Sequence, residues 1–448
     1  MNSPIDVTRL IDDSGIGRYQ WGLLILCGAC MVLDGFDVQA MGYVAPALLQ
    51  DWKVDKASLG PVFGAGLFGL LVGSLVISVL ADKMGRRPVL IGSTFFFAIC
   101  MLLTPLTHTL DQLMIIRFIT GVGLGAIMPN AMALSGEFSP QRKRISIMMI
   151  ISCGFTVGAM LGGVIAAALI PHFGWQSVFY VGGVVPLLIG LAMLKYLPES
   201  IQFQVMKHAP ADKIAALLKR VVPGANLGVR PQFATPEKKE GGVPVMRLFS
   251  EGRAGLTAIL WTISFMNLIA LYFLSNWLPT LAKSTGMSLE NAVLVGAMLQ
   301  FGGTLGTITM GWLIDRLGFR RVLLPCFVVA AGSIALIGHS SASLAMLFAV
   351  VFVTGFAVVG GQPAINAMAA SFYPTALRST GIGWCLGIGR IGAVIGPVVG
   401  GELIRLQLAQ SSLFYAAALP SIIIVLVVLL GLRRERGMAA PRAALAAH

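Results

Sequence analysis

Two aspartates lie in the middle of a long apolar segment near the start of the 448-residue chain. Asp34 and Asp37 are three residues apart, so both would lie on one face of a helix. An acidic residue at the centre of a bilayer costs roughly 2.5–3.5 kcal/mol, and two close carboxylates in a low dielectric do not readily both ionise. We therefore predict that the pair takes up and releases a proton. The alternative is a structural polar pair that satisfies a helix break at Gly35.

Arg117 also lies inside an apolar segment, roughly 8 Å from its outer end at 1.5 Å per residue. Because Asp37 has a similar predicted depth, we expect an ion pair between them. That pair would keep Asp37 ionised and favour Asp34 as the group that carries the proton. The alternative is a fixed structural ion pair. The five histidines fall in connections, in a linker or at the terminus, so a carboxylate must be the titrating group at mid-membrane.

A second buried cation, Arg390, lies midway along a later apolar segment. A guanidinium fits a carboxylate with two parallel hydrogen bonds. We predict that Arg390 binds the carboxylate of an anionic substrate, and a structural or gating ion pair is the alternative.

Neutral polar and aromatic side chains of the apolar segments complete the candidate substrate site. Amides that could recognise hydroxyl groups are Asn130, Asn267, Gln362 and Asn366. Aromatic rings that could stack on a ligand are Tyr272, Phe273, Trp277 and Trp384. Each ring alone fits helix packing or the membrane interface equally well, but together they suit an aromatic ligand better than a sugar.

The elements that must hold these residues are membrane-spanning helices. Hydrophobic residues make up 56% of the chain and charged residues 11%, with a mean hydropathy of +0.85, whereas soluble domains average about 25% charged residues. This composition argues against a soluble enzyme, a disordered chain and a secreted disulfide scaffold, and the six cysteines lie in apolar runs as packing thiols. A span needs about 20 apolar residues, which predicts an all-α polytopic membrane protein with 12 transmembrane helices over 21–48, 58–81, 88–107, 112–136, 145–170, 175–197, 254–282, 289–314, 321–339, 343–372, 378–404 and 411–432.

The net charge of +13 is distributed unevenly along the chain. Most of the 32 lysines and arginines fall in the termini and in alternate connections, which is the positive-inside pattern of membrane proteins. We therefore expect both termini in the cytoplasm, and no nucleic-acid partner.

The chain repeats itself. A shift of 233 places residues 80–90 on residues 313–323, so that Asp82 meets Asp315, and a shift of 234 aligns the fourth and fifth spans with the tenth and eleventh. Two six-span halves in parallel orientation are typical of transporters, with the substrate site between the halves. The predicted domains are 1–20 (cytoplasmic segment), 21–197 (first bundle), 198–253 (cytoplasmic linker with a basic surface helix near 210–221), 254–432 (second bundle) and 433–448 (cytoplasmic tail).

These features resemble the major facilitator superfamily over essentially the whole chain. The loop after the second span matches the superfamily signature as SVLADKMGRR, with Ser78 in place of the first glycine, and Arg117-x-x-x-Gly121-x-Gly123-x-Gly125 looks like the proton-linked motif. The element DGFD at 34–37 resembles the aromatic acid:proton symporter family.

The resemblance implies a proton-coupled importer of small aromatic carboxylates, such as hydroxybenzoates or benzoate, in a bacterial inner membrane. It implies a cavity lined by the first and fourth spans, a functional requirement for Arg390, and a proton gradient as the energy source with no cofactor. We expect a monomer. We recognise no metal-ligand cluster or nucleophile–base pair in the sequence, so an enzyme is not expected.

The two signature loops and the residues near them are predicted to form the inner gate. Their acids can cap helix N-termini in the other half or pair with arginines, and the alternative is that the basic residues only hold the loops inside. This set comprises Asp82, Gly85, Arg86, Arg87, Glu137, Arg144, Asp315, Gly318, Arg320 and Arg378.

Other transport functions stay open at this point. A symporter of another organic anion, such as a dicarboxylate or a sugar acid, is the nearest alternative. A drug/proton antiporter is less well supported, because Ala159 replaces the proline of the antiporter motif G-P-x-x-G-G in the fifth span. A membrane enzyme or receptor has no supporting motif.

Overall fold

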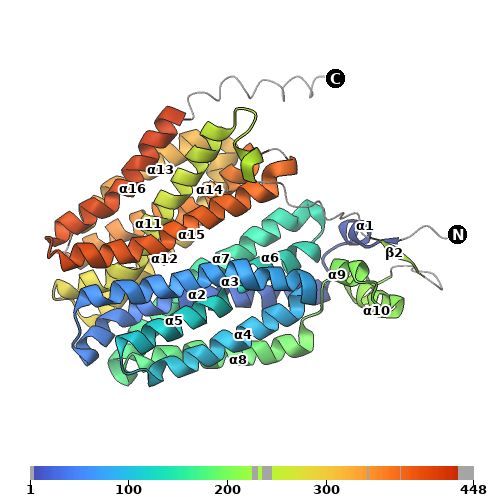
Figure 1. Cartoon of the computed structure of the whole chain (residues 1–448), viewed down its shortest axis with the longest axis horizontal. Coiled ribbons are helices and arrows are strands. Elements are labelled where there is room, and N and C mark those ends of the chain that lie inside the picture. The colour runs from blue at the N-terminus through green and yellow to red at the C-terminus, as the bar shows by residue number, and fades with distance from the viewer. Residues whose placement is uncertain (1–4, 225–230, 235–244, 341–342, 374, 432–448) are drawn as a thin grey trace. The chain divides into compact units, whose positions relative to one another are not determined.

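The computed structural model describes residues 5–224, 231–234, 245–340, 343–373 and 375–431, and these are almost entirely helical (Figure 1). Within them, twelve helical spans are long and apolar enough to cross a membrane, and the fourth span consists of two helices. Large apolar side chains such as Ile25, Leu188 and Leu430 are exposed along these helices, as expected for a surface that meets lipid rather than water. The all-α, twelve-helix fold predicted from the sequence is confirmed.

The contacts divide the chain into two compact units, residues 1–53 with 65–240 and residues 54–64 with 241–448. The long helices of the first unit are α2 (Arg18–Trp52), α3 (Leu59–Met84, whose first turns belong to the second unit), α4 (Arg86–Leu103), α5 (Leu110–Leu124), α6 (Ile127–Glu137), α7 (Gln141–Phe173) and α8 (Gln176–Tyr196). Those of the second unit are α11 (Ala254–Ser284), α12 (Leu289–Leu317), α13 (Phe319–Ile337), α14 (Leu344–Phe372), α15 (Thr375–Arg405) and α16 (Gln410–Gly431).

The repeat seen in the sequence corresponds to repeated helix crossings. In the first unit α3 crosses α5 so closely that a Cβ added at Gly69 would overlap the carbonyl oxygen of Phe118. In the second unit α12 crosses α14 in the same way, with Gly302 against the carbonyl oxygen of Phe352. Gly69 and Gly302 are the positions that the 233-residue shift superimposes, so the repeated glycines serve the same backbone approach in both units.

The fourth span is made of two helices, whereas the sequence predicts one continuous helix over 112–136. α5 ends at Gly125, whose N–H donates to the carbonyl oxygen of Gly121 at 2.9 Å, and α6 begins two residues later. A Cβ at Gly125 would overlap the backbone of Leu70 and Ser74 on α3. The break therefore falls at a position where α3 packs directly against the backbone of α5.

The N-terminal segment and the linker form a small polar subdomain beside the cytoplasmic end predicted for the first unit (Figure 1). It contains β1 (Ile5–Asp6), α1 (Val7–Asp12), α9 (Ile201–Met206), α10 (Ala211–Val221) and β2 (Phe233–Ala234), and β1 pairs with β2 in parallel. α10 confirms the surface helix predicted near 210–221. Its apolar face (Ile214, Leu218 and Val221) is buried, and Lys213, Lys219 and Arg220 are exposed.

Three 3-10 turns complete the described elements: η1 (Lys56–Ser58), η2 (Thr104–Leu106) and η3 (Val245–Leu248). The predicted tail 433–448 lies outside the described residues. The domain boundaries drawn from the sequence stay predictions.

Candidate functional site

The two acids of the first span lie on an uninterrupted helix. Asp34 is 3% exposed and Asp37 0%, and α2 continues through both. The alternative of a helix break at Gly35 is therefore wrong. Gly35 instead allows α7 to approach, because a Cβ there would overlap the carbonyl oxygen of Phe155, and a Cβ at Gly158 would overlap that of Val32. The glycine of the DGFD element thus fixes the face of α2 that packs on α7.

Arg117 of α5 binds Asp37 as the sequence predicts. Its Nη1 donates to Oδ1 at 2.8 Å, and its Nη2 donates to Oδ2 at 3.1 Å and to the Asp37 carbonyl oxygen at 3.2 Å. Both side chains are almost fully buried. Such charge-assisted bonds to both oxygens are strong and directional, so the guanidinium occupies the whole carboxylate of Asp37. Asp34 lies about one turn away on the same helix.

In the second unit, three of the predicted amides form one hydrogen-bonded chain. Asn267 of α11 donates from Nδ2 to the carbonyl oxygen of Val358 at 3.2 Å and to Oε1 of Gln362 at 2.8 Å. Gln362 then donates from Nε2 to Oδ1 of Asn366 at 3.3 Å, one turn along α14. Asn267 is fully buried, whereas Gln362 and Asn366 are half-buried. The fourth predicted amide, Asn130, belongs to the first unit and donates to the carbonyl oxygen of Ala126 in its own helix.

The predicted aromatic set does not gather into one cluster. Trp277 is fully buried, donates to the carbonyl oxygen of Pro397 at 2.9 Å and packs edge-on against Phe63 at 5.1 Å between ring centroids. Its ring and its N–H are both used in packing. Trp384 of α15 is 44% exposed and stacks on Trp261 of α11 at 5.9 Å.

The other candidate substrate groups lie on the same two helices. Tyr272, half-buried, and Phe273, buried, follow Asn267 on α11. Arg390 is half-buried on α15.

The first signature loop ties two neighbouring helices of one unit together. Glu199, which follows α8, accepts hydrogen bonds from the backbone N–H groups of Arg86 at 2.9 Å and Arg87 at 3.3 Å, at the start of α4. In return the Arg87 guanidinium donates to the carbonyl oxygens of Leu197 and Leu194 at 2.7 Å each, at the end of α8. A negative group at a helix N-terminus and a positive group at a C-terminus both complement the helix dipole.

The side chains of the predicted gate divide among several partners. Arg86 forms an ion pair with Glu137 at 2.9 Å, which brings together two residues of the predicted inner network. Gly85 and Gly318 both adopt a positive φ, of 104° and 81°, at equivalent positions of the two loops, which explains why each loop carries glycine there. Asp315 is exposed and Arg320 half-buried. The side chains of Asp82 and Arg378 lie outside those described.

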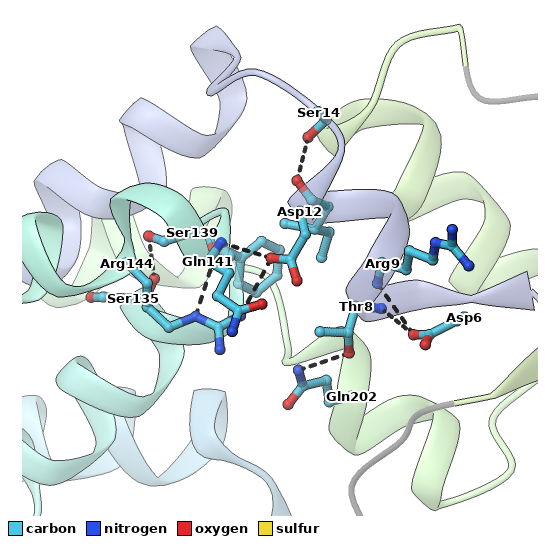
Figure 2. Close-up of polar contacts among 12 residues, drawn as sticks. Asp6, Thr8, Arg9, Asp12, Ser14, Ser135, Ser139, Gln141, Arg144 and Gln202 are labelled. Carbon is cyan, nitrogen blue, oxygen red and sulfur yellow. Dashed lines mark hydrogen bonds and ion pairs between the residues drawn. The ribbon is translucent and has the colours of Figure 1, made fainter. Parts of the chain in front are cut away.

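Arg144 has a partner that the sequence did not indicate. Figure 2 shows Asp12 of the N-terminal segment at the start of α7, where its Oδ1 accepts the N–H of Gln141 at 2.7 Å and lies 3.7 Å from Nη2 of Arg144. The Asp12 carboxylate therefore both caps the N-terminus of α7 and pairs with Arg144, a predicted gating residue. Asp12 and Glu199 are the two acids that sequence reasoning missed. Glu199 could have been found as an acid directly after a span, but nothing local marks Asp12.

No group of three or more His, Cys, Asp or Glu side chains is placed to hold a metal ion among the residues that the structure describes. The acid pair of α2, Arg117, Arg390 and the candidate amides lie within apolar spans. A bundle of two repeated units with polar groups inside its spans defines the class of protein as an integral membrane transporter.

The comparisons identify the family within that class. The chain belongs to the Major Facilitator Superfamily, whose model matches residues 27–303 and 260–447. It is 40% identical to the 4-hydroxybenzoate transporter PcaK of Pseudomonas putida over 90% of both chains. It is 33% identical to the benzoate transport protein of Acinetobacter baylyi, over 97% of this chain and 94% of that one. These relatives confirm the family recognised from the DGFD element.

Among solved structures, a bacterial homologue of the human lysosomal transporter Spinster matches with a TM-score of 0.74 at 16% identity, over 94% of this chain and 98% of that one. At this identity the match shows the fold alone. The fold of the major facilitators is therefore supported independently of the close sequence relatives.

Proposed function

We propose that this protein imports small aromatic carboxylates, such as hydroxybenzoates or benzoate, together with protons. The observation that carries the proposal is the buried acid pair of α2, in which Arg117 occupies Asp37 while Asp34 lies on the same face. Two relatives that cover nearly the whole chain are named as transporters of 4-hydroxybenzoate and of benzoate. Acids within spans commonly mark proton relays.

The roles of the charged groups follow from these contacts. Because the guanidinium of Arg117 binds both oxygens of Asp37, the transported proton binds to Asp34. The guanidinium of Arg390, half-buried in α15, binds the substrate carboxylate bidentately. Proton and anion together leave the loaded carrier with less uncompensated charge than either alone, which lowers the cost of the conformational change of alternating access.

The same proposal includes the cellular location, the orientation and the energy source of the transporter. The protein resides in a bacterial inner membrane as a monomer, with both termini in the cytoplasm, and the positive-inside distribution of its lysines and arginines supports this orientation. A proton gradient supplies the energy, and no cofactor is required.

The test is uptake of labelled benzoate and 4-hydroxybenzoate by proteoliposomes under an inward proton gradient, with and without an uncoupler. Wild type is expected to accumulate substrate only with the gradient. Asp34→Asn is expected to lose accumulation but to keep exchange of internal for external substrate, because exchange needs no net proton movement. Arg390→Ala is expected to lose both.

Asp111→Asn is a matched control, because it makes the same change at an exposed position in the first turn of α5. Accumulation that survives in Asp34→Asn would contradict the assignment of the proton. Uptake driven by an outward proton gradient would indicate an antiporter, and competition by dicarboxylates or sugar acids but not by benzoates would indicate another organic anion.

A further inference from the structure

The amide chain Asn267–Gln362–Asn366 has a direction. The carbonyl oxygen of Val358 can only accept, so the group of Asn267 that faces it is the NH₂. The same nitrogen donates to Oε1 of Gln362, which turns Nε2 of Gln362 towards Oδ1 of Asn366. The chain therefore begins at a buried end on α11 and finishes with N–H donors on the half-buried side chains of α14.

The end of the amide chain at Gln362 and Asn366 has unused hydrogen-bond donors. Among the residues that the structure describes, Nδ2 of Asn366 donates to no acceptor, and Nε2 of Gln362 donates one hydrogen bond and keeps a second N–H unused. Both side chains are half-buried, so a ligand can reach these donors. A ligand group that can accept a hydrogen bond would satisfy them.

A purely structural role accounts for this arrangement poorly. The 234-residue shift places Met128 and Met132 at the positions of Gln362 and Asn366, so the first unit has no amide at these two positions. The buried Gln300 donates to Ser275 at 3.2 Å and links α12 to α11. This amide is an example of a purely structural one, because it is fully enclosed between two helices. The amide chain on α14 is a specialised feature of the second unit.

We propose that the open end of this chain selects substrates by a hydrogen-bond acceptor on the aromatic ring, which favours hydroxybenzoates over benzoates without such a group. The inference rests on the proposed function. Arg390 binds the carboxylate common to all benzoates, and the amide chain donates a hydrogen bond to the oxygen substituent on the ring. A site that donates to a ring oxygen discriminates strongly against analogues that leave its donors unsatisfied.

The test compares isosteric pairs of substrates as competitors of uptake. At the same ring position, hydroxybenzoate is compared with methylbenzoate and methoxybenzoate with ethylbenzoate, because each pair differs little in size but only one member accepts a hydrogen bond. Wild type is expected to prefer the oxygen-bearing member of both pairs by about tenfold in KM, as one hydrogen bond would give. In Gln362→Leu and Asn366→Leu the preference should fall to within about twofold, because KM rises for the oxygen-bearing members and does not rise for the methyl and ethyl members.

Gln300→Leu is the matched control, since it removes a buried interhelical amide of the same kind and should keep the tenfold preference. An amide chain that only stabilised the helices would lower uptake of both members equally and leave the ratio intact, which would overturn the proposal. The substrate series in wild type tests the proposal even where a variant does not fold, because preference for hydroxy but not for methoxy compounds would exclude donors at the chain end. Absence of uptake of both benzoate and hydroxybenzoates by wild type would instead reject the proposed function itself.

Discussion

Arg117 holds Asp37 by both carboxylate oxygens and by its backbone carbonyl oxygen, which joins α5 to the middle of α2. The three bonds come from two nitrogens of one planar group, so the position of α5 against α2 is set at the depth of the acid pair. Since both side chains are buried, neither charge can be lost without exposing the other to an apolar environment.

We expect Asp37→Asn to destabilise the protein by about 3–5 kcal/mol, because it leaves the Arg117 cation buried against a neutral group. The double variant Asp37→Asn with Arg117→Met should recover much of that loss, since a buried ion pair can often be replaced by neutral groups at little cost. Thermal unfolding in detergent measures both. A double variant as unstable as the single one would show that the ion pair is not the cause.

Replacement of Gly35 by alanine is expected to destabilise α2 against α7 by about 1–3 kcal/mol or more, because the added methyl would overlap the carbonyl oxygen of Phe155. Gly28→Ala is the control on the same helix, since a Cβ there meets nothing within 4 Å. Melting temperatures of the two variants should therefore differ clearly. Equal melting temperatures would mean that the crossing can relax.

Glu199→Gln is expected to cost about 1–2 kcal/mol, because the carboxylate that accepts from the first N–H groups of α4 loses its charge at a helix N-terminus. The same change at Glu290, an exposed acid in the first turn of α12, should have little effect. Thermal unfolding again provides the measurement. A similarly small decrease in melting temperature for both variants would show that Glu199 contributes no more to stability than an exposed acid does.

Asp12→Asn is expected to loosen the N-terminal segment from α7, since Asp12 both caps Gln141 and pairs with Arg144. Trypsin should then cleave after the exposed Arg9 about fivefold faster, because cleavage follows the population of the open form and a lost cap costs about 1 kcal/mol. Asp111→Asn makes the same change at an exposed acid in the first turn of α5, away from the segment, and should cleave at the wild-type rate. Unchanged cleavage in Asp12→Asn would show that other contacts hold the segment.

The spans and the central ion pair could be predicted from the sequence because they depend on local properties. A run of about 20 apolar residues identifies a span by itself, and counting 1.5 Å per residue places Arg117 and Asp37 at one depth. The break between α5 and α6 was not predicted, since Gly125 ends the helix where α3 crowds it, and the identity of that neighbour is a tertiary property.

The polar contacts of the cytoplasmic side were also beyond sequence reasoning. Asp12 meets Gln141 across 129 positions of the chain, and Glu199 meets Arg86 across 113. The amides Asn267, Gln362 and Asn366 were recognised singly as candidates. The one-turn spacing of the last two makes them neighbours on a helix, but the bond from Asn267 depends on how α11 packs against α14.

The repeated glycine crossings limit how either unit can deform. Where a carbonyl oxygen occupies the space of a missing methyl, as at Gly69 and Gly302, one helix cannot shear along the other without driving that oxygen into a side chain. Such sliding of packed helices is one of the two common modes of internal motion, and bending at hinges is the other. Each unit is therefore expected to travel as a rigid body, with its internal bending confined to helix ends and to breaks such as the one at Gly125.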